Sequence, residues 1–170
     1  MEKVLIIGSN GAGKSTFSFS LAEGTGLPLI HIDQIYWRGN WQVTPQAEFD
    51  QLVLAEALKP SWIIEGNNIR SLPGRLQHAD TVFWFEFPPL ICIKNILIRE
   101  WRYRGAARPD MPEGCKSRLS LKFLLYACRF NRRNRKNIAA MLEKVPHVQV
   151  IRFTGRRQVA AYLHSLNMEG

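Results

Sequence analysis

The chain has 170 residues, of which 46% are hydrophobic, and its formal net charge is +9. This length suits one domain with a substantial core and is short for two, so we expect a single domain over residues 1–170. No apolar run approaches the roughly 18 residues that cross a bilayer, and the three cysteines lack the paired spacing of disulfide frameworks and zinc sites. These features predict a soluble, cytoplasmic protein with reduced thiols.

Strand and helix signals alternate along the chain. Five short apolar or β-branched runs, bounded by Gly, Pro or Asp, are typical of buried parallel strands. In chain order these runs span residues 3–8, 28–33, 61–66, 81–87 and 147–153. After the second run, Phe49, Leu52 and Val53 share one face of a helix that we predict over residues 45–58. The alternation predicts an α/β fold with a five-stranded parallel sheet and helices on both faces.

The first predicted strand leads directly into "GSNGAGKST", residues 8–16, which fits the phosphate-binding motif G-x-x-x-x-G-K-[ST]. Glycines let backbone N–H groups face phosphates, and the helix that follows adds its N-terminal dipole. Lys14 can reach the β- and γ-phosphates of ATP, and the Ser15 hydroxyl can ligate Mg²⁺. The predicted nucleotide-binding residues are Gly8, Ser9, Asn10, Gly11, Ala12, Gly13, Lys14, Ser15 and Thr16.

Acidic residues stand at or near the ends of three predicted strands, as Asp33, Glu65 and Glu86. Ligands of open α/β sheets gather at the carboxyl ends of the strands, so we expect these acids near the bound phosphates. One of them can hold Mg²⁺ through water, and another can accept a proton from an attacking hydroxyl. The residues alone leave open which of the three organises magnesium.

All of the excess positive charge lies between Arg99 and Lys136, where twelve Lys or Arg residues accompany three acids. Within this segment, residues 104–118 are rich in Gly, Pro and charge, which predicts an ordered excursion or a mobile flap. Residues 129–137 carry five basic side chains on a predicted helix. The charge therefore has three open interpretations: a solvated helix face, a lid that closes over phosphates, or a nucleic-acid surface.

Five stretches together resemble the DNA topology modulation proteins, which are similar to adenylate and shikimate kinases. They are the P-loop, "HIDQIYW" (31–37), "WIIEGNN" (62–68), "ADTVFWFEFP" (79–88) and "RYRGAARPDMPEGC" (102–115). The resemblance implies a P-loop NTPase of nucleoside monophosphate kinase type. Such an architecture has a five-stranded parallel core, an acceptor site beside the second strand, and an arginine-bearing lid over ATP, here residues 104–118.

The resemblance also implies roles for individual residues. Asp33 matches an acid that contacts the acceptor, and Glu65 matches an acid that helps organise Mg²⁺ together with Ser15. The remaining matches are arginines: Arg70 and Arg75 resemble residues that grip a phosphate of the acceptor, and Arg104 and Arg108 resemble lid arginines.

Three positions depart from the family pattern. Asn95 stands where relatives often have an arginine that stacks on adenine, although Arg99 lies one turn later. Glu65 replaces the usual Asp, which lengthens the side chain by one methylene. Residues 116–118, Lys-Ser-Arg, follow "EGC" where relatives often have Pro-Glu. Base stacking and the metal geometry are the two properties that these departures affect.

Two residues near the second strand have alternative interpretations. Trp37 can stack on an acceptor base or sugar, or it can close the core, as large aromatic residues after a buried strand often do. His31 lies within the apolar run "LIHID", and we interpret it as a hydrogen-bonded core histidine rather than a ligand.

Two functions of different classes remain from the sequence. The first is a phosphotransferase that moves the γ-phosphoryl group of ATP to a small nucleoside, nucleotide or other hydroxyl-bearing acceptor. In it Lys14 and Mg²⁺ hold the donor, Asp33 acts on the acceptor, and Arg104 and Arg108 neutralise charge on the transferred group. The second is a nucleotide-regulated protein that binds nucleic acid through its basic segment. A plain ATPase is a third reading, because no residue pattern proves that an acceptor exists.

Overall fold

The computed structural model describes residues 1–106, 108–116 and 119–168. Its main sheet has five strands in the order β2-β5-β1-β6-β7, and every neighbouring pair is parallel. The strands are β1 (Lys3–Gly8), β2 (Leu29–His31), β5 (Trp62–Glu65), β6 (Thr81–Phe85) and β7 (Gln149–Phe153). Each lies within one of the five predicted runs, so the predicted parallel sheet is confirmed.

Helices connect the strands. They are α1 (Lys14–Thr25), α2 (Ile32–Tyr36), α3 (Gln46–Ala57), α4 (Leu72–His78), α5 (Pro89–Arg102), α6 (Leu121–Leu142) and α7 (Arg156–Met168). The predicted helix over residues 45–58 is confirmed as α3, but Leu52, expected on its inner face, is 45% exposed. In the part of the chain that the structure describes, no helix combines the length and apolar character needed to cross a membrane.

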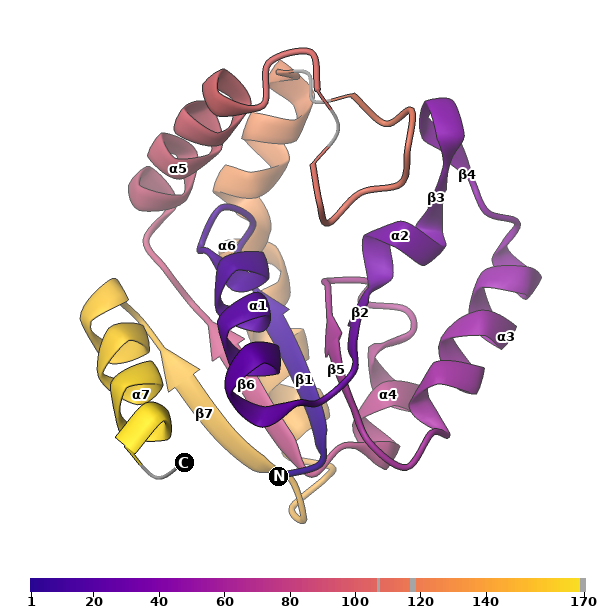
Figure 1. Cartoon of the computed structure of the whole chain (residues 1–170), viewed down its shortest axis with the longest axis vertical. Helices are drawn as coiled ribbons and strands as arrows, with labels where there is room; N and C mark the ends of the chain where they lie inside the picture. Colours follow the sequence, from indigo (N-terminus) through magenta and orange to yellow (C-terminus); the bar gives the residue numbers. More distant parts are fainter. Residues whose placement is uncertain (107, 117–118, 169–170) are drawn as a thin grey trace.

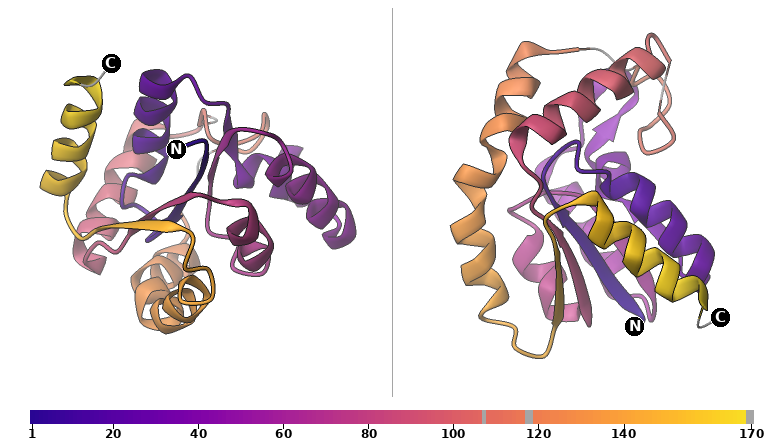
Figure 2. Two further views of the ribbon diagram at one scale, coloured as in Figure 1. Left: turned by 90° about the horizontal axis from the view of Figure 1, so that it is seen from below. Right: turned by 90° about the vertical axis from the view of Figure 1, so that its left-hand side faces the viewer.

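Helices cover both faces of the sheet (Figure 2), and an apolar layer lies between the sheet and the helices on each face. Successive side chains of a strand point to opposite faces, so Leu5 and Ile7 of β1 join one layer whereas Val4 and Ile6 join the other. The first layer is completed by α3, α4 and α6, and the second by α1 and α7. The predicted helices on both faces are thereby confirmed. β1 is the central strand of the sheet, between β5 and β6.

The strand order gives a topological switch point at the carboxyl end of β1. The chain reaches β2 and β5 on one side of β1 and β6 and β7 on the other, so connections leave this point in opposite directions. Ligands of open α/β sheets bind at such a switch point. The segment between α5 and α6 lies beyond these strand ends, close to α2 (Figure 1).

A short hairpin, which the sequence did not predict, follows α2. It pairs β3 (Trp37–Arg38) with β4 (Gln42–Val43) in antiparallel register around the turn Gly39–Trp41. Two-residue strands are too short to show an alternating pattern, so this hairpin could not be predicted from hydrophobic periodicity.

The predicted excursion over residues 104–118 is described for residues 104–106 and 108–116. It consists of turns, with backbone N–H groups of Met111 and Cys115 donating to the carbonyls of Arg108 and Pro112. Residue 107 and residues 117–118, part of the departure noted after "EGC", lie outside the described residues.

Candidate phosphate-binding site

The loop from Gly8 to Gly13 joins β1 to α1 in a conformation that needs glycine. Gly8 has φ +125° and Gly11 has φ +80°, both in the region that side chains disfavour. A Cβ atom at Gly8 would lie 2.1 Å from the carbonyl oxygen of Phe85, and one at Gly11 would lie 2.4 Å from that of Cys92. The motif glycines thus allow the loop to pack directly against β6 and α5, with α1 starting at Lys14.

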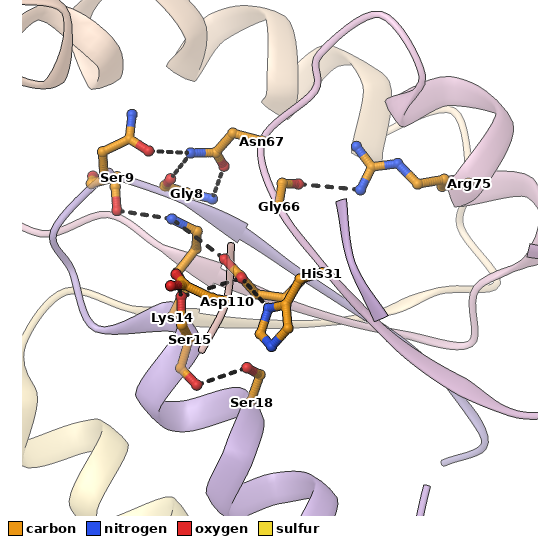
Figure 3. A network of polar contacts seen from close by, with 12 residues as sticks. Gly8, Ser9, Lys14, Ser15, Ser18, His31, Gly66, Asn67, Arg75 and Asp110 are labelled. Atoms are coloured by element: carbon orange, nitrogen blue, oxygen red, sulfur yellow. Dashed lines mark hydrogen bonds and ion pairs between the residues drawn. The ribbon is translucent and has the colours of Figure 1, made fainter. Parts of the chain in front are cut away.

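Three asparagines from separate elements hold this loop. The Asn67 side chain accepts a hydrogen bond from the Gly8 N–H at 2.8 Å and donates to the Gly8 carbonyl (Figure 3). Asn131 of α6 accepts from the Ser9 hydroxyl at 2.7 Å, and Asn95 of α5 donates to the Gly11 carbonyl at 2.7 Å. The loop is therefore fixed in place before any ligand contacts it, which favours preorganised binding.

Sequence reasoning missed the role of these asparagines. Asn67 follows a strand directly in "EGNN", which is the one local signal that was available. Asn95 drew attention only as the replacement of an arginine, whereas its amide bonds the loop and its oxygen accepts from Arg156. Asn131 lies 122 residues from its partner, Ser9, so no local pattern reports the contact.

Lys14 is buried at the base of the loop. Its Nζ donates to the Ser9 carbonyl at 3.2 Å and lies 3.9 Å from Oε1 of Glu65. Burial lowers the pKa of Lys14, and the Glu65 carboxylate opposes that shift. A lysine is rarely buried without a partner anion, so this position combines a structural ion pair with a charge directed at the phosphate loop.

Glu65, at the end of β5, forms a polar cluster with Lys14, Ser15 and His31, three nearby residues that Figure 3 labels together with Asp110. Its Oε2 lies 2.9 Å from Nδ1 of His31 and 3.3 Å from the Ser15 hydroxyl. His31 is buried, which confirms its interpretation as a hydrogen-bonded core histidine. It also orients Glu65, because the bond fixes one carboxylate oxygen toward Ser15.

The Ser15 hydroxyl also lies 3.0 Å from Oδ2 of Asp110, a residue of the excursion. Ser15, Glu65 and Asp110 together present hydroxyl and carboxylate oxygens, the ligand type that Mg²⁺ prefers. Within residues 1–106, 108–116 and 119–168, no three His, Cys, Asp or Glu side chains form a metal-binding group of their own. The donor set fits Mg²⁺ that takes its other ligands from phosphates and water, as is usual for this ion.

Asp33 lies in the first turn of α2, beside this cluster. Desolvation by the surrounding protein, followed by repulsion from Glu65, raises the pKa of Asp33 to about 6, and Lys14 and Arg108 act in the opposite direction. The residue nevertheless remains exposed to solvent. An accessible carboxyl group with a raised pKa beside a phosphate loop is suited to proton transfer.

Two arginines approach the site from α5 and the excursion. Arg108 lies 3.4 Å from Asp110 through Nε, and its side chain is only 11% exposed. Burial lowers the pKa of Arg99, and the positive charge of Arg108 lowers it further. Arg108 Nη1 and Arg99 Nε are buried without hydrogen-bond partners among the described residues. These two donors and Lys14 form a positively charged setting for an anion.

The other predicted residues are exposed or have partners outside the polar cluster. Thr16 and Arg104 are exposed, and Arg104 pairs with no described residue. Arg70 forms an exposed ion pair with Asp50, at 3.3 Å. Arg75 is fully buried, where its guanidinium donates to the carbonyls of Gly66 and Asn68.

Two more residues from the sequence analysis lie away from the loop. Trp37 packs edge-on against Tyr36 and Trp41 and lines a cavity of about 290 Å³ whose lining residues include none of the P-loop. Glu86 forms ion pairs with Arg135, at 3.0 Å, and Arg152. Of the three strand-end acids, Asp33 and Glu65 adjoin the phosphate loop, whereas Glu86 ties β6 to α6 and β7.

Comparisons with known proteins support the fold. No protein-family model matches the chain, and no curated protein matches its sequence. The chain is similar to the crystal structure of shikimate kinase from Bacteroides thetaiotaomicron, with a TM-score of 0.53 and 17% identity, covering 98% of this chain and 96% of that one. A sugar kinase structure from Janibacter sp. HTCC2649 has a TM-score of 0.47 and 14% identity, over 98% and 90% of the two chains.

The likeness to shikimate kinase confirms the predicted kinase-like α/β P-loop fold. At this level of identity it shows the fold alone. The resemblance to the DNA topology modulation proteins stays a prediction, since no family model matches.

Proposed function

We propose that the protein is an ATP-dependent, kinase-like phosphotransferase. The observation that carries this proposal is a glycine loop with Lys14 buried at its base, together with two arginines, Arg99 and Arg108, that each have a buried N–H donor without a partner among the described residues. Lys14, Arg99 and Arg108 each have a carboxylate nearby, but the unused buried N–H donors of the two arginines are unfavourable unless an anion of high charge binds to them. A nucleoside triphosphate is such an anion, and its phosphates are what a P-loop holds.

The chain's residues divide the work of the transfer. Backbone N–H groups of residues 13–16, where the loop enters α1, and the Lys14 ammonium hold the donor phosphates, because the N–H groups of Gly8 and Ser9 already donate to Asn67 and Phe85. Ser15 and Glu65 hold Mg²⁺, which when bound neutralises phosphate charge. Asp33 accepts the proton of the attacking acceptor group. Arg108, assisted by Arg104 if the excursion moves inward on binding, stabilises charge that spreads over the transferred group.

The acceptor is a small nucleoside, nucleotide or other hydroxyl compound that binds beside α2. Both arginines proposed to grip an acceptor phosphate have other partners, since Arg70 pairs with Asp50 and Arg75 binds backbone carbonyls. This arrangement favours an acceptor that offers a hydroxyl group to Asp33 over one that depends on a phosphate contact with Arg75.

An acceptor screen tests this proposal. Purified protein with Mg-ATP is incubated with nucleosides, nucleotides, sugars and hydroxy acids, while ADP release and phosphorylated product are measured separately. We expect ADP release to rise with one acceptor class and to match the product formed. ADP release that no acceptor changes would instead identify an ATPase, and absence of nucleotide binding would contradict the proposal.

A second candidate function is nucleic-acid binding with the nucleotide as regulator. It is favoured by a row of exposed basic residues on α6: Arg129, Arg132, Arg133 and Lys136. Such a row can contact successive phosphates without reading bases. The sequence resemblance to DNA topology modulation proteins also favours nucleic-acid binding. Neutralising the exposed basic residues of α6 separates this candidate function from the kinase proposal.

A further inference from the structure

A carboxylate from the excursion reaches the phosphate loop. Oδ2 of Asp110 lies 3.0 Å from Oγ of Ser15, although the two residues are 95 positions apart in the chain. Oε2 of Glu65 lies 3.3 Å from the same hydroxyl oxygen. A serine hydroxyl carries one proton, so it cannot donate fully to both carboxylates at once. The three oxygens are better satisfied together by a cation than by one hydrogen atom.

The protein holds Asp110 in this position through its neighbours. Nε2 of Gln34, on α2, donates to the Pro109 carbonyl at 3.0 Å, and Nε of Arg108 lies 3.4 Å from Oδ1 of Asp110. Two side chains that follow, Met111 and Cys115, are buried, and the Cys115 thiol donates to the Arg38 carbonyl. Asp110 is therefore part of a packed turn, not the tip of a free loop.

Charge in the site is arranged in two groups. Lys14, Arg99 and Arg108 supply positive charge for phosphates, whereas Glu65, Asp110 and Asp33 supply negative charge close to Ser15. The carboxylates repel one another, since Glu65 and Asp110 both favour the protonated form of Asp33. A divalent cation beside Ser15 relieves this repulsion, and the phosphate-binding motif places its metal at that residue.

We propose that Asp110 is a metal-site residue: with Ser15 and Glu65 it binds the divalent cation that accompanies the nucleotide. This inference rests on the proposed nucleotide site and adds a residue that the sequence did not single out. It also links the excursion to the ligand, because Arg108, which directs its charge at the phosphates, is two residues away and contacts the same carboxylate. The metal, through Asp110, and the nucleotide, through Arg108, would then both bind the turn of residues 108–111.

The test separates nucleotide binding from metal binding. ADP affinity is measured by calorimetry in EDTA, and Mn²⁺ bound to the protein–ADP complex is then counted by electron paramagnetic resonance. For Asp110→Asn we expect ADP affinity in EDTA within about 2-fold of wild type, but Mn²⁺ affinity in the complex lower by about 10-fold or more. Glu113→Gln is the matched control, because Glu113 is an exposed carboxylate of the next turn of the excursion, and it should change neither value.

Each outcome has a defined meaning. Unchanged or tighter Mn²⁺ binding by Asp110→Asn, with normal ADP binding, would overturn this inference alone. Failure of the wild-type protein to bind ADP would overturn the proposed function and this inference with it. Asp110→Glu keeps the charge with a longer side chain and serves as the second variant; its Mn²⁺ affinity should fall between those of wild type and Asp110→Asn, and an affinity below that of Asp110→Asn would contradict metal binding by the carboxylate.

Discussion

Two groups of basic side chains share one strongly positive segment, yet their surroundings differ. Arg99 and Arg108 are partly buried beside the phosphate loop, and each has a buried N–H without a partner among the described residues. Arg132, Arg133 and Lys136 of α6 are exposed to solvent. Exposed charges are hydrated and cost little to maintain, whereas buried ones need a compensating partner. Burial of charge therefore identifies an anion site better than the number of charges does.

The largest effect on ATP binding and turnover is expected from removing the charge of Lys14, the buried lysine at the base of the phosphate loop. Lys14→Ala should weaken ATP binding and lower turnover by at least about 100-fold, because a preorganised cation in a desolvated site has no neighbour that replaces it. Nucleotide titration and an ADP-release assay measure the two effects. Lys94→Ala removes an exposed lysine of α5 as the control. Unchanged ATP affinity in Lys14→Ala would contradict the assignment of the loop.

The next effect compares two arginines of the excursion. Arg108→Ala should lower kcat by roughly 10²- to 10³-fold, since it removes a donor directed at the transferred group. Arg104→Ala should lose less, because Arg104 is exposed and unpaired among the described residues. Single-turnover kinetics at saturating ATP measures both. Equal losses would indicate that the excursion moves inward on binding, and a loss of only a few-fold in Arg108→Ala would contradict its proposed role.

Asp33→Asn tests the acceptor side of the site. We expect ATP binding within a few-fold of wild type and phosphoryl transfer lower by about 100-fold, the size of a typical general-base contribution. A base must be ionised, and the pKa of Asp33 is about 6. The wild-type kcat/KM should therefore rise with pH through that value, and the variant should lose this limb. Full transfer activity in Asp33→Asn would contradict the general-base role and leave Asp33 with a structural role at the start of α2.

The same variant has a stability effect of opposite sign. The folded-state pKa of Asp33, about 6, exceeds the ordinary aspartate pKa of 3.8, so folding favours its protonated form and stability falls as pH rises between these values. Asp33→Asn should melt about 1–3 °C higher than wild type near pH 8 and equally near pH 3.5, a small gain because Asp33 is exposed. Asp50→Asn, which breaks an exposed ion pair with Arg70, should not melt higher at either pH. Equal melting of Asp33→Asn and wild type near pH 8 would contradict the raised pKa.

The sequence predicted those features that local pattern determines. Buried parallel strands are apolar runs, and the phosphate loop is a contiguous motif, so both could be located by residue number. Contacts between distant segments could not be predicted, because Asp110 and Asn131 reach the loop from 95 and 122 residues away. Side-chain direction was equally hidden. The family resemblance made Arg75 a second candidate for a phosphate contact, but its guanidinium donates to backbone carbonyls in the core.

The smallest effect on catalysis is expected from the exposed group on α6. We neutralise Arg132, Arg133 and Lys136 together as glutamines and leave Arg135 in place, because Arg135 pairs with Glu86. If these residues only form a solvent-exposed face of the helix, turnover should stay within about 3-fold of wild type, since exposed surface charges contribute little to stability or to a distant site.

If they form a nucleic-acid surface, the wild-type protein should bind DNA with a steep salt dependence. In the triple variant the slope of log affinity against log salt concentration should be shallower by about 2 to 3 units. We expect the first result, with DNA binding weaker than micromolar at physiological salt. A tighter complex that the triple variant loses would contradict this expectation. It would make DNA binding through α6 the main function and the nucleotide site, with its buried cations, the regulator of that binding.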